Sequence, residues 1–184
     1  KFYPKSKLLQ RIELNGFTSM IRDKFSGIWE SYNHLRLKFV LPRSSNVSAR
    51  YRYSTEVFLG EEFDTRGFDV FGHSQITRNL FFQVKLGQRN AVFYSAEPYQ
   101  GNSQDVSAAF RYQASDKLEA RLAYTYSNFT RGLDQKRIYD YAITRSRLTY
   151  QANKYLFFRG ILEYNSFRKD LLTDFLASFL YIPG

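Results

Sequence analysis

Residues 118–126 read LEARLAYTY, and this stretch decides the fold class. Apolar side chains occupy every second position from Leu118 to Tyr126, and Glu119 and Arg121 lie between them. A period of two is typical of a β-strand with one apolar and one polar face, because successive side chains point to opposite sides of the backbone. The stretch therefore predicts a strand rather than an amphipathic helix.

The same alternation continues outward from this stretch in roughly ten segments, each about 11 to 15 residues long. Strands of soluble sheets are typically about 5–6 residues long, whereas tilted strands that cross a membrane need about 9–11 residues. The segments are long enough to cross a bilayer. We expect strands near 7–21, 28–41, 46–59, 66–77, 80–94, 104–114, 117–130, 138–151, 155–167 and 172–182.

The expected connections alternate between tight turns and longer links. Tight turns are expected at 78–79, 115–116 and 153–154, and longer links at 60–65, 95–103, 131–137 and 168–171. Short periplasmic turns and longer external loops are typical of outer-membrane barrels. The tight turns are therefore expected to face the periplasm.

The composition agrees with a membrane barrel. Aromatic residues make up 18% of the chain and hydrophobic residues only 43%, with a mean hydropathy of -0.46. When one face of each strand meets lipid and the other a polar lumen, the apolar and polar residues together give a hydrophobic fraction and a mean hydropathy of this size. No run approaches the ~20 apolar residues of a membrane-spanning helix. The sequence predicts an all-β, antiparallel up-and-down transmembrane β-barrel, with residues 1–184 in one outer-membrane domain.

Basic residues occupy the positions opposite the apolar stripe of their own strands, and the formal net charge is +10. We expect them to line the lumen, where they would attract anionic solutes or pair with acidic groups of a plug or neighbouring domain. The alternative is that they pair with Glu13, Glu30, Glu56, Glu119 and Glu163 and only keep the interior wet. These lumen-lining candidates are Arg36, Lys38, Arg50, Arg52, Lys85, Arg89, Arg111, Arg121, Arg145, Arg147 and Arg159.

Aromatic residues gather near the expected strand ends. Rings with one polar end favour the membrane interface, so aromatic girdles are the natural interpretation. Stacking platforms for nucleic acid are the alternative, but they need rings and cations on one face. The interfacial candidates are Trp29, Tyr51, Tyr53, Tyr124, Tyr126, Phe129, Phe179 and Tyr181.

The sequence offers little for catalysis, metals or cofactors. It has no Cys and only 2 His, and Ser74, which follows His73, points to the opposite face of a strand. We therefore expect no catalytic residues, no cofactor and no metal. One weak calcium candidate remains in Glu61, Glu62 and Asp64, for which a solvated acidic loop is the other interpretation.

Three stretches carry a resemblance to a known family. They are YQGNSQDVSAAFRYQASDKLEARLAYTYS (99–127), RSRLTYQANKYLFFRGILEYNSFRKDLLTDFLASFLYIPG (145–184) and, more weakly, GEEFDTRGFDVF (60–71). From about Gly101 onward, the chain resembles the C-terminal barrel of uncharacterised bacterial outer-membrane proteins, common in Bacteroidetes and often labelled carbohydrate-binding family 9 domain-containing proteins. Residues 1–43 match only in their alternation.

The resemblance implies a large barrel preceded by a periplasmic, sugar-binding-like module, with no firmly established catalytic residues or substrate. This chain departs from the pattern because it lacks that module and stops at Pro183 and Gly184, where family members continue through further strands. A carbohydrate role is therefore in doubt. We expect these residues to be part of a longer polypeptide whose barrel has at least about twelve strands.

The leading hypothesis is an integral barrel of the bacterial outer membrane that acts as a pore, scaffold or docking element with a basic polar lumen. Its expected partners are outer-membrane lipid and lipopolysaccharide, and other outer-membrane or periplasmic subunits, but no nucleic acid. A soluble basic β-protein that binds nucleic acid or polysaccharide is the runner-up. An outer-membrane hydrolase is the third alternative.

Overall fold

The computed structural model describes residues 1–180 as one antiparallel sheet of eleven strands, with no helix. The period of two along the sequence is the reason, since it leaves no helical stripe to bury. The strands are β1 (Arg11–Arg22), β2 (Trp29–Leu41), β3 (Ser45–Phe58), β4 (Glu61–Asp64), β5 (Gly67–Thr77), β6 (Leu80–Phe93), β7 (Tyr99–Ser115), β8 (Leu118–Arg131), β9 (Arg137–Gln151), β10 (Leu156–Asn165) and β11 (Asp170–Phe179).

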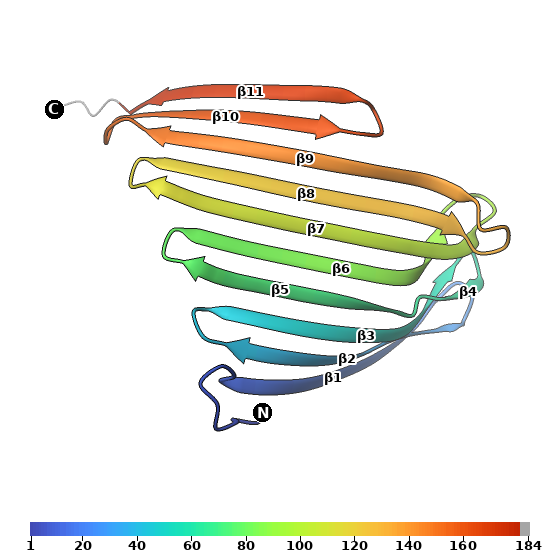
Figure 1. The fold of residues 1–184 in the computed structure, drawn as a ribbon. Helices are drawn as coiled ribbons and strands as arrows, with labels where there is room; N and C mark the ends of the chain where they lie inside the picture. Colours follow the sequence, from blue (N-terminus) through green and yellow to red (C-terminus); the bar gives the residue numbers. More distant parts are fainter. Residues whose placement is uncertain (181–184) are drawn as a thin grey trace.

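The topology is up-and-down, as predicted. The sheet order is β1-β2-β3-β5-β6-β7-β8-β9-β10-β11, and β4 pairs only with β3. Figure 1 shows the strands side by side, with β1 and β11 at opposite edges of the sheet. Within residues 1–180, no pairing joins β1 to β11, so the sheet is open at these two edges and is not closed into a barrel.

The structure corrects the predicted link at 60–65, most of which is the strand β4. A tight hairpin joins it to β3 through Leu59 and Gly60, whose φ angles of 53° and 82° are those of a two-residue type I′ turn. Phe63 is buried, while the rest of β4 is acidic. A single apolar residue in four is too little alternation to predict a strand.

A second correction concerns β7, which begins at Tyr99 although 95–103 was predicted to be a link. Gly101 lies in this added part, and the ring of Phe129 on β8 covers it: a Cβ on Gly101 would lie 2.5 Å from Phe129 Cζ. An aromatic ring that covers a strand glycine supplies the packing that glycine lacks. The first strand also begins later than predicted, at Arg11 rather than near residue 7.

The sheet bends at the end that carries the longer connections. There, Tyr94, just after β6, donates a hydrogen bond of 2.5 Å from its hydroxyl to Glu56, in the part of β3 that pairs with β4. The side-chain amide of Gln100 on β7 donates to the carbonyl oxygen of Asp64 on β4. Figure 1 shows β4 and the ends of β1 to β3 turned out of line with the other strands at this end. The bend makes one face of the sheet concave.

Candidate functional site

The register divides the sheet into two chemically different faces, because directly paired residues on neighbouring strands point to the same side. We call the side of Glu119, Arg121 and Thr125 the polar face, and the side of Leu118 and Leu122 the apolar face. All the predicted lumen-lining residues share the polar face by register. They are Arg36, Lys38, Arg50, Arg52, Lys85, Arg89, Arg111, Arg121, Arg145, Arg147 and Arg159.

Acidic residues neutralise part of this charge. Asp69 accepts two hydrogen bonds from Arg50, at 2.9 and 2.6 Å. Glu119 lies 2.6 Å from Arg121 and 3.7 Å from Arg147. Further pairs on this face are Arg11–Glu13, Arg145–Glu163 and Arg159–Asp174.

Two of the acids that were considered as neutralising partners have other roles. Glu30 accepts a hydrogen bond from the backbone N–H of Val57, and Glu56 accepts from Tyr94. Among the described residues, Lys38 and Lys85 have no acidic partner within 4.0 Å. The polar face therefore keeps an excess of positive charge.

Two glycines lie in neighbouring rows of the polar face. Gly67 on β5 lies directly between Arg52 on β3 and Arg89 on β6. A Cβ on Gly67 would lie 2.5 Å from the Cβ of Arg89, so the close approach of the backbone requires glycine here. In the next row, Gly87 lies between Asp69 and Asp105. The first of these positions, Gly67 flanked by Arg52 and Arg89, is called the glycine notch below.

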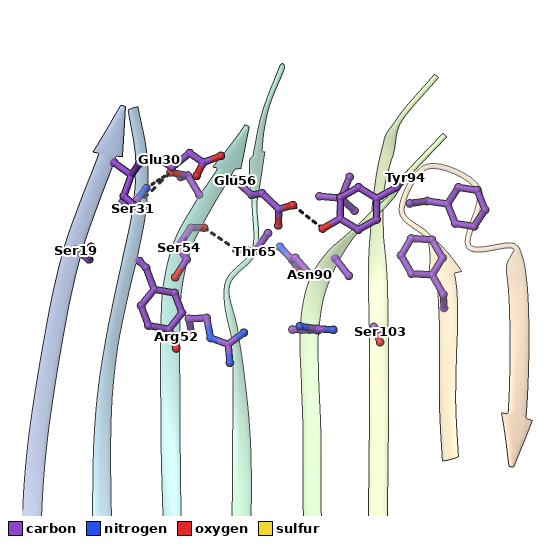
Figure 2. A pocket seen from close by; sticks show the side chains of 18 of the residues that line it. Ser19, Glu30, Ser31, Arg52, Ser54, Glu56, Thr65, Asn90, Tyr94 and Ser103 are labelled. Carbon is purple, nitrogen blue, oxygen red and sulfur yellow. Dashed lines mark hydrogen bonds between the residues drawn. The ribbon is translucent and has the colours of Figure 1, made fainter. Parts of the chain in front are cut away.

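Two pockets meet at the glycine notch. The first has a volume of about 560 Å³, and the second, of about 350 Å³, includes Lys85, Gly87 and Asp105. Arg52 and Arg89 line both. Figure 2 shows the first pocket, whose lining includes Ser54 and Thr65 on the side of Arg52 and Ser103 on the opposite side. The pair of arginines is thus the link between a hydroxyl-rich pocket and a more charged one.

An aromatic cluster closes the first pocket on the side of β6 to β9. Phe129 is only 2% exposed, and its ring centroid lies 5.7 Å from that of Phe93, 6.2 Å from that of Tyr99 and 5.9 Å from that of Tyr139. The guanidinium of Arg131 stacks on Tyr99 at 4.5 Å. The cluster is a small hydrophobic core on an otherwise polar face, and it holds the bend of the sheet.

Phe129 was predicted to lie at a membrane interface, and the structure places it elsewhere. It belongs to the polar face, because it has the same parity along β8 as Glu119 and Arg121. The sequence carried this signal, since the parity can be read without a structure. The other predicted interfacial rings in the described residues, Trp29, Tyr51, Tyr53, Tyr124, Tyr126 and Phe179, are on the apolar face, and Tyr181 lies outside the described residues.

The apolar face leaves large hydrophobic side chains uncovered. In the middle of β8 to β11, Leu122, Leu148, Leu162 and Phe175 are 47%, 53%, 51% and 74% exposed. Exposed apolar patches of more than a few hundred Å² are rare on soluble monomers, and they mark a surface that meets another apolar phase or a partner.

The apolar band has a sharp limit toward the longer connections. Leu86, Val106, Tyr126 and Ala142 form one row across β6 to β9. The next apolar-face row, Gln88, Gln104, Asn128 and Asp140, is entirely polar. Asn128 and Gln104 hydrogen-bond to each other at 3.0 and 3.1 Å. On β2, Trp29 lies beyond the polar Asn33 and hence outside the apolar band.

The acidic group that was a weak calcium candidate does not form a loop site. Glu61, Glu62 and Asp64 lie along β4, where alternation points the neighbouring Glu61 and Glu62 to opposite sides. The carboxylate of Asp64 is bound by the guanidinium of Arg66. Within residues 1–180, no group of three or more His, Asp or Glu side chains is close enough together to hold a metal ion.

Both histidines contact neighbouring side chains of the sheet. The side-chain amide of Asn46 lies 2.9 Å from Nε2 of His73, whereas Ser74 on the opposite face hydrogen-bonds to Ser45 at 2.8 Å. His34 stacks on Phe17 with ring centroids 5.6 Å apart. These contacts explain both side chains as parts of the sheet packing.

Comparisons with known proteins add no relative. No protein-family model, no curated protein and no solved structure matches the chain. Within the described part of the chain, no helix is both long and apolar enough to cross a membrane.

Proposed function

We propose that this sheet is part of the wall of a transmembrane β-barrel in a bacterial outer membrane. The apolar face would meet lipid, and the polar face would line a hydrated lumen. The observation that carries this proposal is the limit of the apolar band, where the row from Leu86 to Ala142 gives way to the polar row from Gln88 to Asp140. A bilayer has such a boundary at the headgroups, and a soluble protein that covers the face would not require one.

The height of the band fits a membrane. From Leu118 to Tyr126, the apolar side chains of β8 span eight residue steps, which at about 3.4 Å per step is about 27 Å along the strand, or about 21 Å along the membrane normal at a tilt of about 40°. Outer-membrane barrels have an apolar band about 25 Å tall with aromatic residues at both limits. Tyr112 and Tyr150 lie near the limit beside the short turns, and Tyr124 and Tyr126 lie near the other. These tyrosines are therefore candidates for two aromatic girdles.

The proposed barrel acts as a pore, scaffold or docking element, with a basic lumen and with outer-membrane lipid and lipopolysaccharide as its surroundings. We further propose that additional strands complete it, to at least about twelve. Direct pairing of β1 with β11 would close a narrow barrel whose interior is nearly filled by side chains. The excess of arginine and lysine on the polar face would then be crowded without water, at a desolvation cost that the available acids do not offset.

A pair of tryptophan positions on one strand tests the contact with lipid. In a Trp29→Phe background, Leu122→Trp puts a reporter on the apolar face, and Ala123→Trp puts one at the same depth on the polar face. In vesicles with bromine-labelled acyl chains, quenching is expected for Leu122→Trp and not for Ala123→Trp. Equal quenching, or none, would contradict the proposed orientation of the faces.

Detergent dependence separates the membrane barrel from the runner-up, a soluble basic β-protein. A chain that exposes this apolar band is expected to need detergent or lipid to remain monodisperse. A monodisperse preparation in plain buffer would remove the membrane proposal. Turnover of phospholipid or glycan that is lost on replacing one Ser or His would instead favour the third alternative, a hydrolase.

The topology is tested with single cysteines, since the native chain has none. Glu97 lies in the connection before β7, and Asp134 lies in the connection between β8 and β9. On whole cells, an impermeant thiol reagent is expected to label Glu97→Cys and Asp134→Cys. It should not reach Asp116→Cys in a short turn. Labelling of Asp116→Cys alone would reverse the proposed orientation.

A further inference from the structure

The glycine notch gathers cations whose hydrogen-bonding groups are free. Arg52 and Arg89 point to the same side of Gly67, with their backbones separated by two strand spacings, about 10 Å. Each guanidinium reaches an acid only at the outer limit of an ion pair: 3.8 Å from Arg52 to Asp69, and 4.0 Å from Arg89 to Asp105. The Nε of Arg52 is buried and has no hydrogen-bond partner among the described residues.

The nearby acids are already engaged with other groups. Asp69 accepts its short hydrogen bonds from Arg50. Asp105 accepts from Ser127 at 2.8 Å and from Ser103 at 3.3 Å. Arg52, Lys85 and Arg89 therefore outnumber the acids that could neutralise them in the second pocket.

We propose that the glycine notch binds an oxyanion group, the carboxylate or phosphate of a solute held on the polar face. Guanidinium groups present planar sets of N–H donors that match the oxygens of both ions. The second pocket, of about 350 Å³, leaves room for the anion beside Arg52 and Arg89, and Lys85 adds a third cation to the same pocket. The site adds a ligand class to the proposed function of the basic lumen. It rests on that proposal only because the polar face must be open to water.

The anion would also remove a cost that the chain otherwise carries. Two guanidinium groups that face each other across one residue repel, and partial burial of Arg52 weakens the screening by water. An anion between them turns this repulsion into two attractions. The hydroxyl groups of the first pocket, which begins at the same two arginines, would then contact the rest of the solute.

Titration calorimetry of the full chain folded in detergent micelles tests the site, with inorganic phosphate and acetate as separate probes. We expect saturable binding of at least one ion, weakened about tenfold or more by Arg52→Gln and by Arg89→Gln. Binding of only one ion identifies the preferred group. The matched control is Arg121→Gln, which removes a polar-face arginine that Glu119 already pairs, and it should leave the affinity unchanged.

The absence of saturable binding, or equal weakening by all three variants, would overturn the site, since equal weakening indicates only a general attraction of the basic face. A second measurement needs no variant: phosphate should protect Arg52 and Arg89, but not Arg121, from modification by phenylglyoxal, as read by peptide mass spectrometry. Equal protection of all three would contradict the proposal. Lipid quenching of Leu122→Trp is independent of both readouts, so the failure of the membrane proposal and of the anion site can be told apart.

Discussion

Replacing Phe129 with Ala should be among the most damaging single changes in this sheet. The ring is only 2% exposed and contacts the rings of Phe93, Tyr99 and Tyr139, while also covering Gly101. Truncation of a buried Phe to Ala costs about 3–5 kcal/mol, and each lost aromatic pair is worth about 0.5–1.5 kcal/mol beyond its buried area. We expect Phe129→Ala to lower the free energy of unfolding by about 4 kcal/mol, a large part of a typical total of about 5–15 kcal/mol.

Denaturant unfolding of the chain in micelles, followed by circular dichroism, measures this change. The control is Phe25→Ala in the β1–β2 connection, where the side chain is fully exposed and the expected cost is within about 0.5 kcal/mol. Gly101→Ala should be harmful both alone and in the Phe129→Ala background, because its Cβ would strike the carbonyl oxygen of Thr130 as well as the ring of Phe129. A cost for Phe129→Ala below about 1 kcal/mol would refute the packing argument.

Two further predictions concern charge. Arg50→Ala removes both hydrogen bonds to the half-buried Asp69 and is expected to cost about 1–3 kcal/mol, whereas Arg137→Ala at an exposed ion pair should cost at most about 0.5 kcal/mol in the same unfolding assay. The hydrogen bond to Glu56, with a smaller effect of burial, raises the pKa of Tyr94 to about 12. This value lies above the pKa of about 10 in the unfolded chain. The hydrogen bond therefore contributes fully to the free energy of unfolding below pH ~10, and its contribution is lost as the pH rises through about 12. Glu56→Gln should return the pKa of Tyr94, followed by NMR of labelled tyrosine, toward its ordinary value, and an unchanged pKa would contradict the assigned cause.

The up-and-down sheet and the sharing of one face by the basic residues could be predicted because both depend on local alternation. Every second residue of a strand points to the same side, so the parity that separates Glu119 from Leu118 also sorts the residues of each neighbouring strand. The short turns between consecutive strands then fix which strands are neighbours. Residue parity and the order of the strands were enough to predict that Arg145 and Arg159 lie on the polar face.

The glycine notch could not be predicted in the same way. Arg52, Gly67 and Arg89 lie on three strands, and their meeting depends on the register of two pairings that are set by turn geometry. β4 and the start of β7 were missed for a related reason. Their strand conformation depends on contacts from other strands, the ring of Phe129 over Gly101 being the clearest case, and not on their own alternation.

The arrangement of charge on the polar face favours water over a dry core. Arg111, Arg121 and Arg147 are directly opposite one another on β7, β8 and β9, and Arg36 is opposite Arg50. Like charges at directly paired positions destabilise a sheet, and a second layer packed on this face would remove the water that screens them. Glu119 neutralises part of the charge in the row of Arg111, Arg121 and Arg147 by pairing with Arg121 and Arg147. Arg111 lies over the ring of Phe81. An apolar face that is uncovered and a polar face that requires water support the proposed barrel wall, and the proposed hydrated lumen is the environment in which the rows of arginine cost least.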